Sequence, residues 1–143
     1  MNQPNFIWVL GHQIQPQQIT GDYDLVNGET PPKTEGPPPH MHKGFHEVFI
    51  VTEGEMSFLI DGQPRTAKKG DVINLQPETV HTFSNETDQP CKWINIHSPK
   101  GFLAFFKEFG VTSDIEDARQ RSVAPSIIGD VIRKAADHDM HIV

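Results

Sequence analysis

The sequence predicts an all-β protein, a small antiparallel barrel followed by α-helices. Two observations carry this prediction. Residues 6–97 contain short apolar runs between glycine- and proline-rich turns, and the 12 prolines among 143 residues would be costly in a helical bundle. From residue 98 the spacing of apolar residues changes to that of helices. At this length we expect one domain over residues 1–143, with the barrel over about 6–97 and the helical extension over about 98–143.

The barrel strands are predicted from alternation and from turn signals. The pair Asp61-Gly62 is a strong hairpin signal between two runs of alternating polarity. Gly70 and Asp71 mark the start of a further strand, and the glutamine-rich residues 12–20, which include Pro16, fit a loop or an irregular edge strand. The other predicted strands cover residues 6–10, 22–30, 45–53, 56–60, 81–85 and 92–97.

Three helices are predicted after the barrel. Ser98 is a good N-cap, Pro99 suits the first helical position, and Gly110 suits the end of the first helix. We expect the second helix over about 113–120 and the third over about 125–137. The first helix carries a stripe of Phe102, Phe105, Phe106 and Phe109, which we expect to pack outside the barrel or across a dimer rather than to form a substrate wall.

Composition excludes several classes of partner and location. The formal net charge of −7 and the pI near 5.5 argue against nucleic acid and anionic membranes, since both favour a basic surface. The single cysteine, Cys91, is expected to be a small buried residue in a strand, in agreement with a reducing compartment. Residues 1–5 lack the start of an export signal, and no stretch reaches 18 apolar residues, so we expect a soluble cytoplasmic protein.

Residues 36–54 carry three candidate metal ligands, His40, His42 and Glu47. His40 and His42 are two residues apart, so in an extended strand they point to the same side. Glu47 would face away in an unbroken strand. A hairpin loop at residues 43–46 would make His42 and Glu47 opposed partners, with Cβ atoms about 5 Å apart. Two imidazoles and a carboxylate at one point suit a first-row divalent metal.

A second stretch, residues 70–85, adds His81, which shares one strand face with Phe83 and Asn85 and offers a fourth ligand. The alternative is a hydrogen-bonded polar cluster without a metal. We do not expect the other histidines to bind metal. His46 is assigned to the loop or the mouth of the site, His97 and His12 to structural hydrogen bonds or solvent, and His138 and His141 to a solvated tail.

These two stretches resemble the two motifs of the cupins. In the first motif, G-x5-H-x-H-x3,4-E-x6-G, His40, His42, Glu47 and Gly54 match; in the second, G-x5-P-x-G-x2-H-x3-N, Gly70, His81 and Asn85 match. The sequence departs from the motifs at turn positions: Gly36 lies four residues before His40 instead of six, Pro77 comes one position late, and Glu78 replaces a glycine. The resemblance implies a jelly-roll-like barrel with one metal ion held by His40, His42, Glu47 and His81.

The order Ser-Pro-x-Gly-Phe-x-x-Phe-Phe-x-x-Phe-Gly from Ser98 is similar to that of single-domain bacterial cupins likened to quercetin 2,3-dioxygenase. This likeness implies a homodimer and an oxygenase for a small enol or aromatic substrate, with Glu47 as the catalytic base and ring cleavage that releases carbon monoxide. Fe, Mn, Ni, Cu and Zn all fit the ligands. Two alternatives stay open: a cupin that binds a metal and a small ligand without turnover, and a metal-dependent isomerase or lyase.

Overall fold

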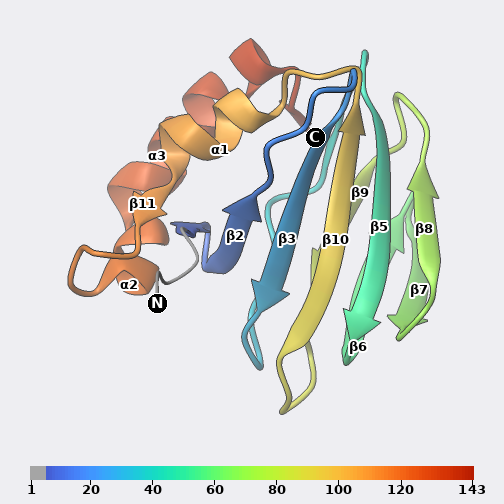
Figure 1. Ribbon diagram of the computed structural model, residues 1–143, viewed down its shortest axis with the longest axis horizontal. Helices are drawn as coiled ribbons and strands as arrows, with labels where there is room; N and C mark the ends of the chain where they lie inside the picture. The colour runs from blue at the N-terminus through green and yellow to red at the C-terminus, as the bar shows by residue number, and fades with distance from the viewer. Residues whose placement is uncertain (1–5) are drawn as a thin grey trace.

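The computed structural model describes residues 6–143 and contains two facing antiparallel sheets (Figure 1). Residues 1–5, on which the expected lack of an export signal depends, lie outside the described residues. The larger sheet has the order β11-β1-β2-β3-β10-β5-β8 and the smaller one β12-β4-β9-β6-β7. The larger sheet consists of β1 (Ile7–Val9), β2 (His12–Pro16), β3 (Asp24–Thr30), β5 (His46–Glu53), β8 (Val72–Leu75), β10 (Cys91–Ser98) and β11 (Val111–Thr112). The smaller sheet consists of β4 (His40–Met41), β6 (Glu55–Ile60), β7 (Gln63–Lys68), β9 (His81–Ser84) and β12 (His141–Ile142).

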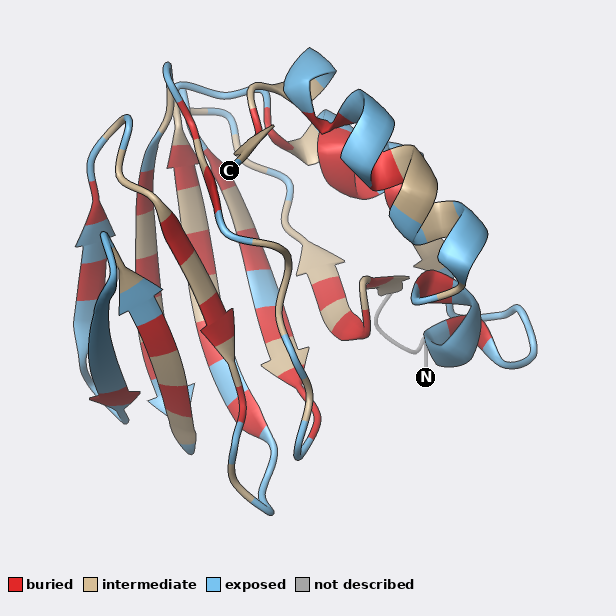
Figure 2. Ribbon diagram, turned by 180° about the vertical axis from the view of Figure 1, so that it is seen from behind, coloured by how far each residue is buried: buried red, intermediate tan, exposed pale blue. Residues whose placement is uncertain are grey.

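The core lies between the sheets, because alternate residues of each strand point inward. In β5 and β10 buried residues alternate with more exposed ones, a pattern that Figure 2 displays as coloured bands. Between the sheets, Phe49 packs against Phe58 and Phe83, and Trp93 packs against Phe83, with ring centroids 5.2 to 5.8 Å apart. Cys91 is buried at the start of β10, as predicted. The predicted all-β, jelly-roll-like architecture is therefore confirmed.

The helices lie together beside the β2 end of the larger sheet, away from β7 and β8 (Figure 1). They are α1 (Leu103–Phe109), α2 (Ala118–Ser122), α3 (Pro125–Lys134) and the 3-10 helix η1 (Ala135–His138). The strand β11 lies between α1 and α2 in the sequence and pairs with β1, and β12 follows η1 and pairs with β4. None of the helices in residues 6–143 is long and apolar enough to cross a membrane.

The predicted start of the first helix is wrong. Ser98 is the last residue of β10 and pairs with His46, and the helix begins at Leu103. The buried carboxylate of Asp24 accepts hydrogen bonds from the backbone N–H groups of Gly101 and Leu103, at 2.7 and 3.3 Å. This long-range acceptor, rather than Ser98, satisfies the start of α1. The second helix is also shorter than predicted, whereas the third begins at Pro125 as expected.

The turn at Asp61-Gly62 is confirmed, since Ile60 pairs with Gln63 and both turn residues have positive φ. The predicted hairpin at residues 43–46 is wrong. The strand β4 belongs to the smaller sheet, where it pairs with β9 and β12, whereas β5 belongs to the larger sheet. Residues 42–45 therefore cross from one sheet to the other.

Candidate metal centre

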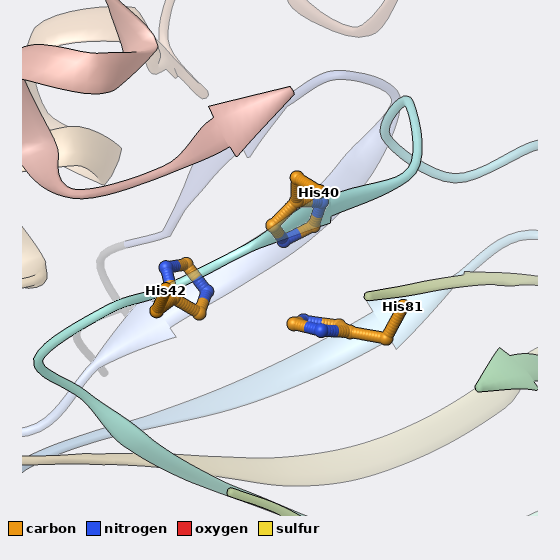
Figure 3. A group of neighbouring side chains, drawn as sticks. All are labelled: His40, His42 and His81. Carbon is orange, nitrogen blue, oxygen red and sulfur yellow. The ribbon is translucent and has the colours of Figure 1, made fainter. Parts of the chain in front are cut away.

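The crossing between sheets brings the four predicted ligands together. His40 lies on β4 and pairs with His81 on β9, so that both rings point into the space between the sheets, and His42 follows directly after β4 (Figure 3). Glu47 reaches the same space from β5, in the opposite sheet. All four side chains are buried. The sequence prediction that these residues converge is thus correct, although the hairpin proposed to bring Glu47 close is not.

Two overlapping groups of these side chains could hold a metal ion: His40, His42 and His81, and His42, Glu47 and His97. Nε2 of His42 and Nε2 of His81 lie 3.2 and 3.0 Å from Oε1 of Glu47. Ligand atoms of His40, His42 and His81 lie within 4.8 Å of one another. The described residues contain four buried side-chain atoms without a hydrogen-bond partner, and all four belong to this cluster: Nε2 of His42, His81 and His97, and Oε1 of Glu47.

Backbone carbonyls fix the tautomers of three histidines. Nδ1 of His40 lies 2.8 Å from Pro38 O, Nδ1 of His81 lies 2.8 Å from Thr79 O, and Nδ1 of His42 lies 2.7 Å from Asp139 O. A carbonyl oxygen only accepts, so Nδ1 carries the hydrogen in each ring. In a neutral ring Nε2 then has a free lone pair directed toward the cluster, which is the usual arrangement of a metal-binding histidine.

Electrostatics favour an ionised Glu47 beside neutral His40. Burial alone raises the pKa of Glu47, but His97 and the close approach of His42 and His81 outweigh burial and hold this pKa well below its ordinary value. Burial, together with His81, lowers the pKa of His40 to about 3. Burial also works to lower the pKa of His81, but adjacent Glu47 outweighs it and leaves this pKa raised. The cluster therefore offers one carboxylate and at least one free imidazole.

His97 and Asn95 belong to the site, although neither was predicted there. Both lie on β10, and His97 pairs with Glu47. Nε2 of His97 lies 3.5 Å from Oε2 of Glu47, and Nδ2 of Asn95 donates a hydrogen bond to the same oxygen at 2.9 Å. The sequence predicted a structural hydrogen-bonding role for His97 but not its position beside Glu47, because the pairing of β5 with β10 cannot be read from either segment alone. The only signal was its position on the inward face of a strand.

The other histidines lie outside the cluster. His46 is exposed at the start of β5. His12 is buried and hydrogen-bonded through both ring nitrogens, to the Thr30 hydroxyl and the Glu35 carbonyl. Of its two predicted roles, structural hydrogen bonds or exposure to solvent, the first is therefore correct. His138 and His141, expected in solvent, instead lie 2.9 Å from Glu108 and Asp139 respectively.

Two of the three departures from the cupin motifs have structural explanations. Gly36 passes so close to β9 that a Cβ at this position would lie 1.7 Å from Phe83 O, so only glycine fits. Glu78 has a φ of 70°, the left-handed conformation that suits the glycine of the motif. The backbone N–H of Glu78 donates to His42 O at 2.6 Å, so this turn holds the backbone of a candidate ligand.

The C-terminal segment also supports His42. The carbonyl of Asp139 accepts the Nδ1 hydrogen of His42, and its carboxylate accepts the backbone N–H groups of Lys43 and Gly44, at 2.9 and 2.7 Å. Strand β12 then pairs with β4, and Met140, directly before β12, is buried in the core. No local sequence signal points to this support, since 97 residues separate Asp139 from His42.

The cluster lines a cavity of about 60 Å³. Besides the histidines, Glu47 and Asn95, the lining is apolar and includes Phe49, Trp93, Met140, Phe102, Phe105 and Phe106. The phenylalanine stripe of α1 thus faces the site with three of its members, contrary to the expected packing outside the barrel. A larger hollow of about 860 Å³ lies beyond Leu10, Pro37 and Phe83, but none of the cluster residues lines it.

A double-sheet β fold with a buried cluster of histidines and one glutamate defines a protein of the cupin class. A family model described as "Cupin domain" matches residues 28–97, which include all four predicted ligands, so this part of the chain belongs to the cupin superfamily. Quercetin 2,3-dioxygenase from Bacillus subtilis is 29% identical over 101 residues, which cover 69% of this chain and 29% of that protein. The chain spans between a fifth and about half the length of the curated relatives it matches.

Solved structures share the fold. An RmlC-like cupin from Shewanella frigidimarina matches with a TM-score of 0.59 and 22% identity, over 70% of this chain and 88% of the other. A sugar phosphate isomerase of the cupin superfamily from Silicibacter pomeroyi matches with a TM-score of 0.59 and 19% identity, over 64% and 61% of the two chains. Relatives of this fold therefore carry different activities, and the activity of this chain has to be argued from its site.

Proposed function

We propose that this protein is a metal-dependent oxidoreductase of the dioxygenase type, which acts on a small enol. The observation that carries the proposal is the set of buried, unpartnered donor atoms at the cluster. Buried polar atoms without partners are costly, and a cation bound by His42, Glu47 and His81 satisfies three of these four atoms at once. His40, His42, Glu47 and His81 are the proposed ligands.

The donor set fits a divalent transition metal. Three imidazoles and one carboxylate suit Fe, Mn, Ni, Cu or Zn and leave room for further ligands. When bound, such a metal supplies a Lewis acid that lowers the pKa of an enol and, for a redox-active ion, a path for electrons to dioxygen. Dioxygen is the oxidant: a carbon–carbon bond of the enol substrate is cleaved, and both oxygen atoms are retained in the products.

Glu47 is the proposed catalytic base. Its carboxylate is ionised, and Oε1 lies among the histidine ligands where an enol hydroxyl would bind. Asn95 holds Oε2, so the carboxylate has a fixed direction from which to accept the enol proton. The aromatic lining excludes bulk water, which strengthens these electrostatic interactions.

Two alternatives are weighed against the lining of the cavity. Among residues 6–143, no lysine or arginine lines it, although a sugar phosphate would call for such cations. This disfavours the isomerase activity that the Silicibacter relative's description suggests. A protein that binds metal and ligand without turnover has the same site, so only an activity measurement separates it from the oxygenase.

Oxygen consumption with a panel of enols tests the proposal. Protein loaded separately with Fe, Mn, Ni, Cu or Zn is incubated with quercetin and with small β-dicarbonyl compounds, in air and under anaerobic conditions. We expect oxygen-dependent loss of at least one enol, abolished in Glu47→Gln and retained in His46→Gln, because His46 is exposed beside the site. Turnover without oxygen would instead favour an isomerase or lyase, and no turnover with any metal would refute the oxygenase.

The organisation of residues 1–143 as one domain, the homodimer and the cytoplasmic location stay predictions of the sequence. Size-exclusion chromatography with light scattering tests the second of these directly.

A further inference from the structure

We infer that the substrate is a compact monoanion, such as the enolate of a small dicarbonyl, and that Phe102 limits its size. This inference rests on the proposed metal site and names the class of molecule that the site admits. It follows from three features of the cavity: its volume, its charge and the wall that α1 builds across it.

The volume restricts the ligand to a few atoms. A cavity of about 60 Å³ corresponds to about four to six water-sized positions, if each needs about 10 to 15 Å³. Pockets for drug-sized ligands have volumes of about 300 to 1,000 Å³. A flavonol such as quercetin, with three rings, belongs to the second group. It cannot reach the cluster unless the wall of the cavity is displaced.

Charge balance restricts the ligand to one negative charge. Glu47 is the only carboxylate among the cavity-lining residues that the structure describes, and a divalent metal beside it leaves a net charge of +1. A monoanion would make the buried complex neutral. A dianion such as a phosphate monoester would leave an excess negative charge in an apolar cavity that no lysine or arginine lines, at a high desolvation cost.

The wall is formed by aromatic rings of α1 and of its N-cap residue, Phe102, that rest directly on the cluster. The ring of Phe102 stacks on His97 at 4.2 Å between centroids and lies 4.9 Å from the ring of His42. Phe105 in turn stacks on Phe102 at 5.0 Å. Removing the Phe102 side chain would therefore enlarge the cavity at the point where a ligand meets the metal.

The start of α1 is fixed, so this wall is a part of the site rather than a loose cover. Asp24 accepts the backbone N–H groups of Gly101 and Leu103, on both sides of Phe102. Burial raises the pKa of Asp24, but these hydrogen bonds and Lys100 outweigh burial and lower it, so the acceptor stays charged. Phe109 belongs to the same stripe and is equally buried, but it does not line the cavity. It is the matched control for Phe102.

Binding to Co²⁺-loaded protein without oxygen tests the inference, with the visible spectrum of the metal as the signal. The ligands are pentane-2,4-dione, methyl phosphate as a dianion of similar size, and quercetin. We expect pentane-2,4-dione alone to change the spectrum of the wild type. Phe102→Ala should tighten metal-dependent binding of quercetin by about tenfold or more, whereas Phe109→Ala should not. Phe102→Leu serves if the alanine variant does not fold.

Each other outcome overturns the inference: metal-dependent binding of quercetin to the wild type, binding of methyl phosphate as tight as that of the dione, no binding of the dione, or equal effects of the two phenylalanine variants. Binding of quercetin to the wild type that is equal with and without Co²⁺ does not involve the metal and agrees with the inference. Binding of the dione without turnover in air would refute the oxygenase but keep the inference. Oxidation of quercetin by the wild type would do the reverse.

Discussion

Asp139 provides a test of how the C-terminal segment supports the metal site. Its carboxylate accepts two backbone N–H groups, from Lys43 and Gly44, directly after the ligand His42. Asparagine tolerates the left-handed conformation of this residue, which has a φ of 58°, but offers only one acceptor oxygen and no charge. Asp139→Asn should therefore leave one N–H unpaired and weaken the other bond, at a cost of about 1 to 2 kcal/mol.

This loss should appear in metal affinity. With the segment less firmly attached, the carbonyl of Asp139 no longer fixes the Nδ1 hydrogen of His42, and loss of such a support typically weakens metal binding about 10- to 100-fold. We expect the dissociation constant for Zn²⁺, measured by competition with a chromophoric chelator, to rise about tenfold in Asp139→Asn. Asp137→Asn, in the same segment but exposed, is the control. A folded Asp139→Asn protein with wild-type affinity would refute the reasoning.

Three further predictions concern stability, measured by chemical denaturation of the metal-free protein. Glu78→Gly should raise the free energy of unfolding by about 1 kcal/mol, since glycine relieves the left-handed strain of an exposed residue; a decrease would contradict this. Gly36→Ala should lower it by more than about 3 kcal/mol, because the added Cβ would collide with Phe83 O, and unchanged stability would show that this approach is not tight. Burial lowers the pKa of His12 to about 4, so between pH 6.5 and 4 this histidine is protonated in the unfolded chain but not in the folded one. The free energy of unfolding should therefore decrease by about 3 kcal/mol as the pH is lowered from 6.5 to 4. His12→Gln should remove that part of the pH dependence and His46→Gln should not; equal pH profiles of His12→Gln and the wild type would be the contrary result.

Local patterns predicted those parts of the site that depend on local geometry. His40 and His42 share a side because alternation in an extended segment requires it, and His81 shares a face with Phe83 for the same reason. The ligand set itself was implied by the spacing of the cupin motifs. The turn at Asp61-Gly62 followed from the conformational preference of its two residues.

The contacts that local patterns could not predict are those between distant segments. The position of Glu47 depends on β5 pairing with β8 and β10, and not with β4, which no period within residues 36–54 encodes. The same limit explains why His97 was missed and why Asp139 gave no signal. The start of α1 was misplaced because its acceptor, Asp24, lies about 80 residues earlier in the chain.

Metal analysis of the purified protein tests whether the buried histidines and Glu47 bind a transition metal ion. The wild type, His42→Ala, Glu47→Ala and the control His46→Ala are purified without chelator, dialysed against a mixture of the five candidate metals and measured by mass spectrometry. We expect about one transition ion per chain for the wild type and His46→Ala, and a large loss for the other two variants. A folded wild type that retains no ion, or ligand variants that retain as much as the wild type, would contradict this expectation.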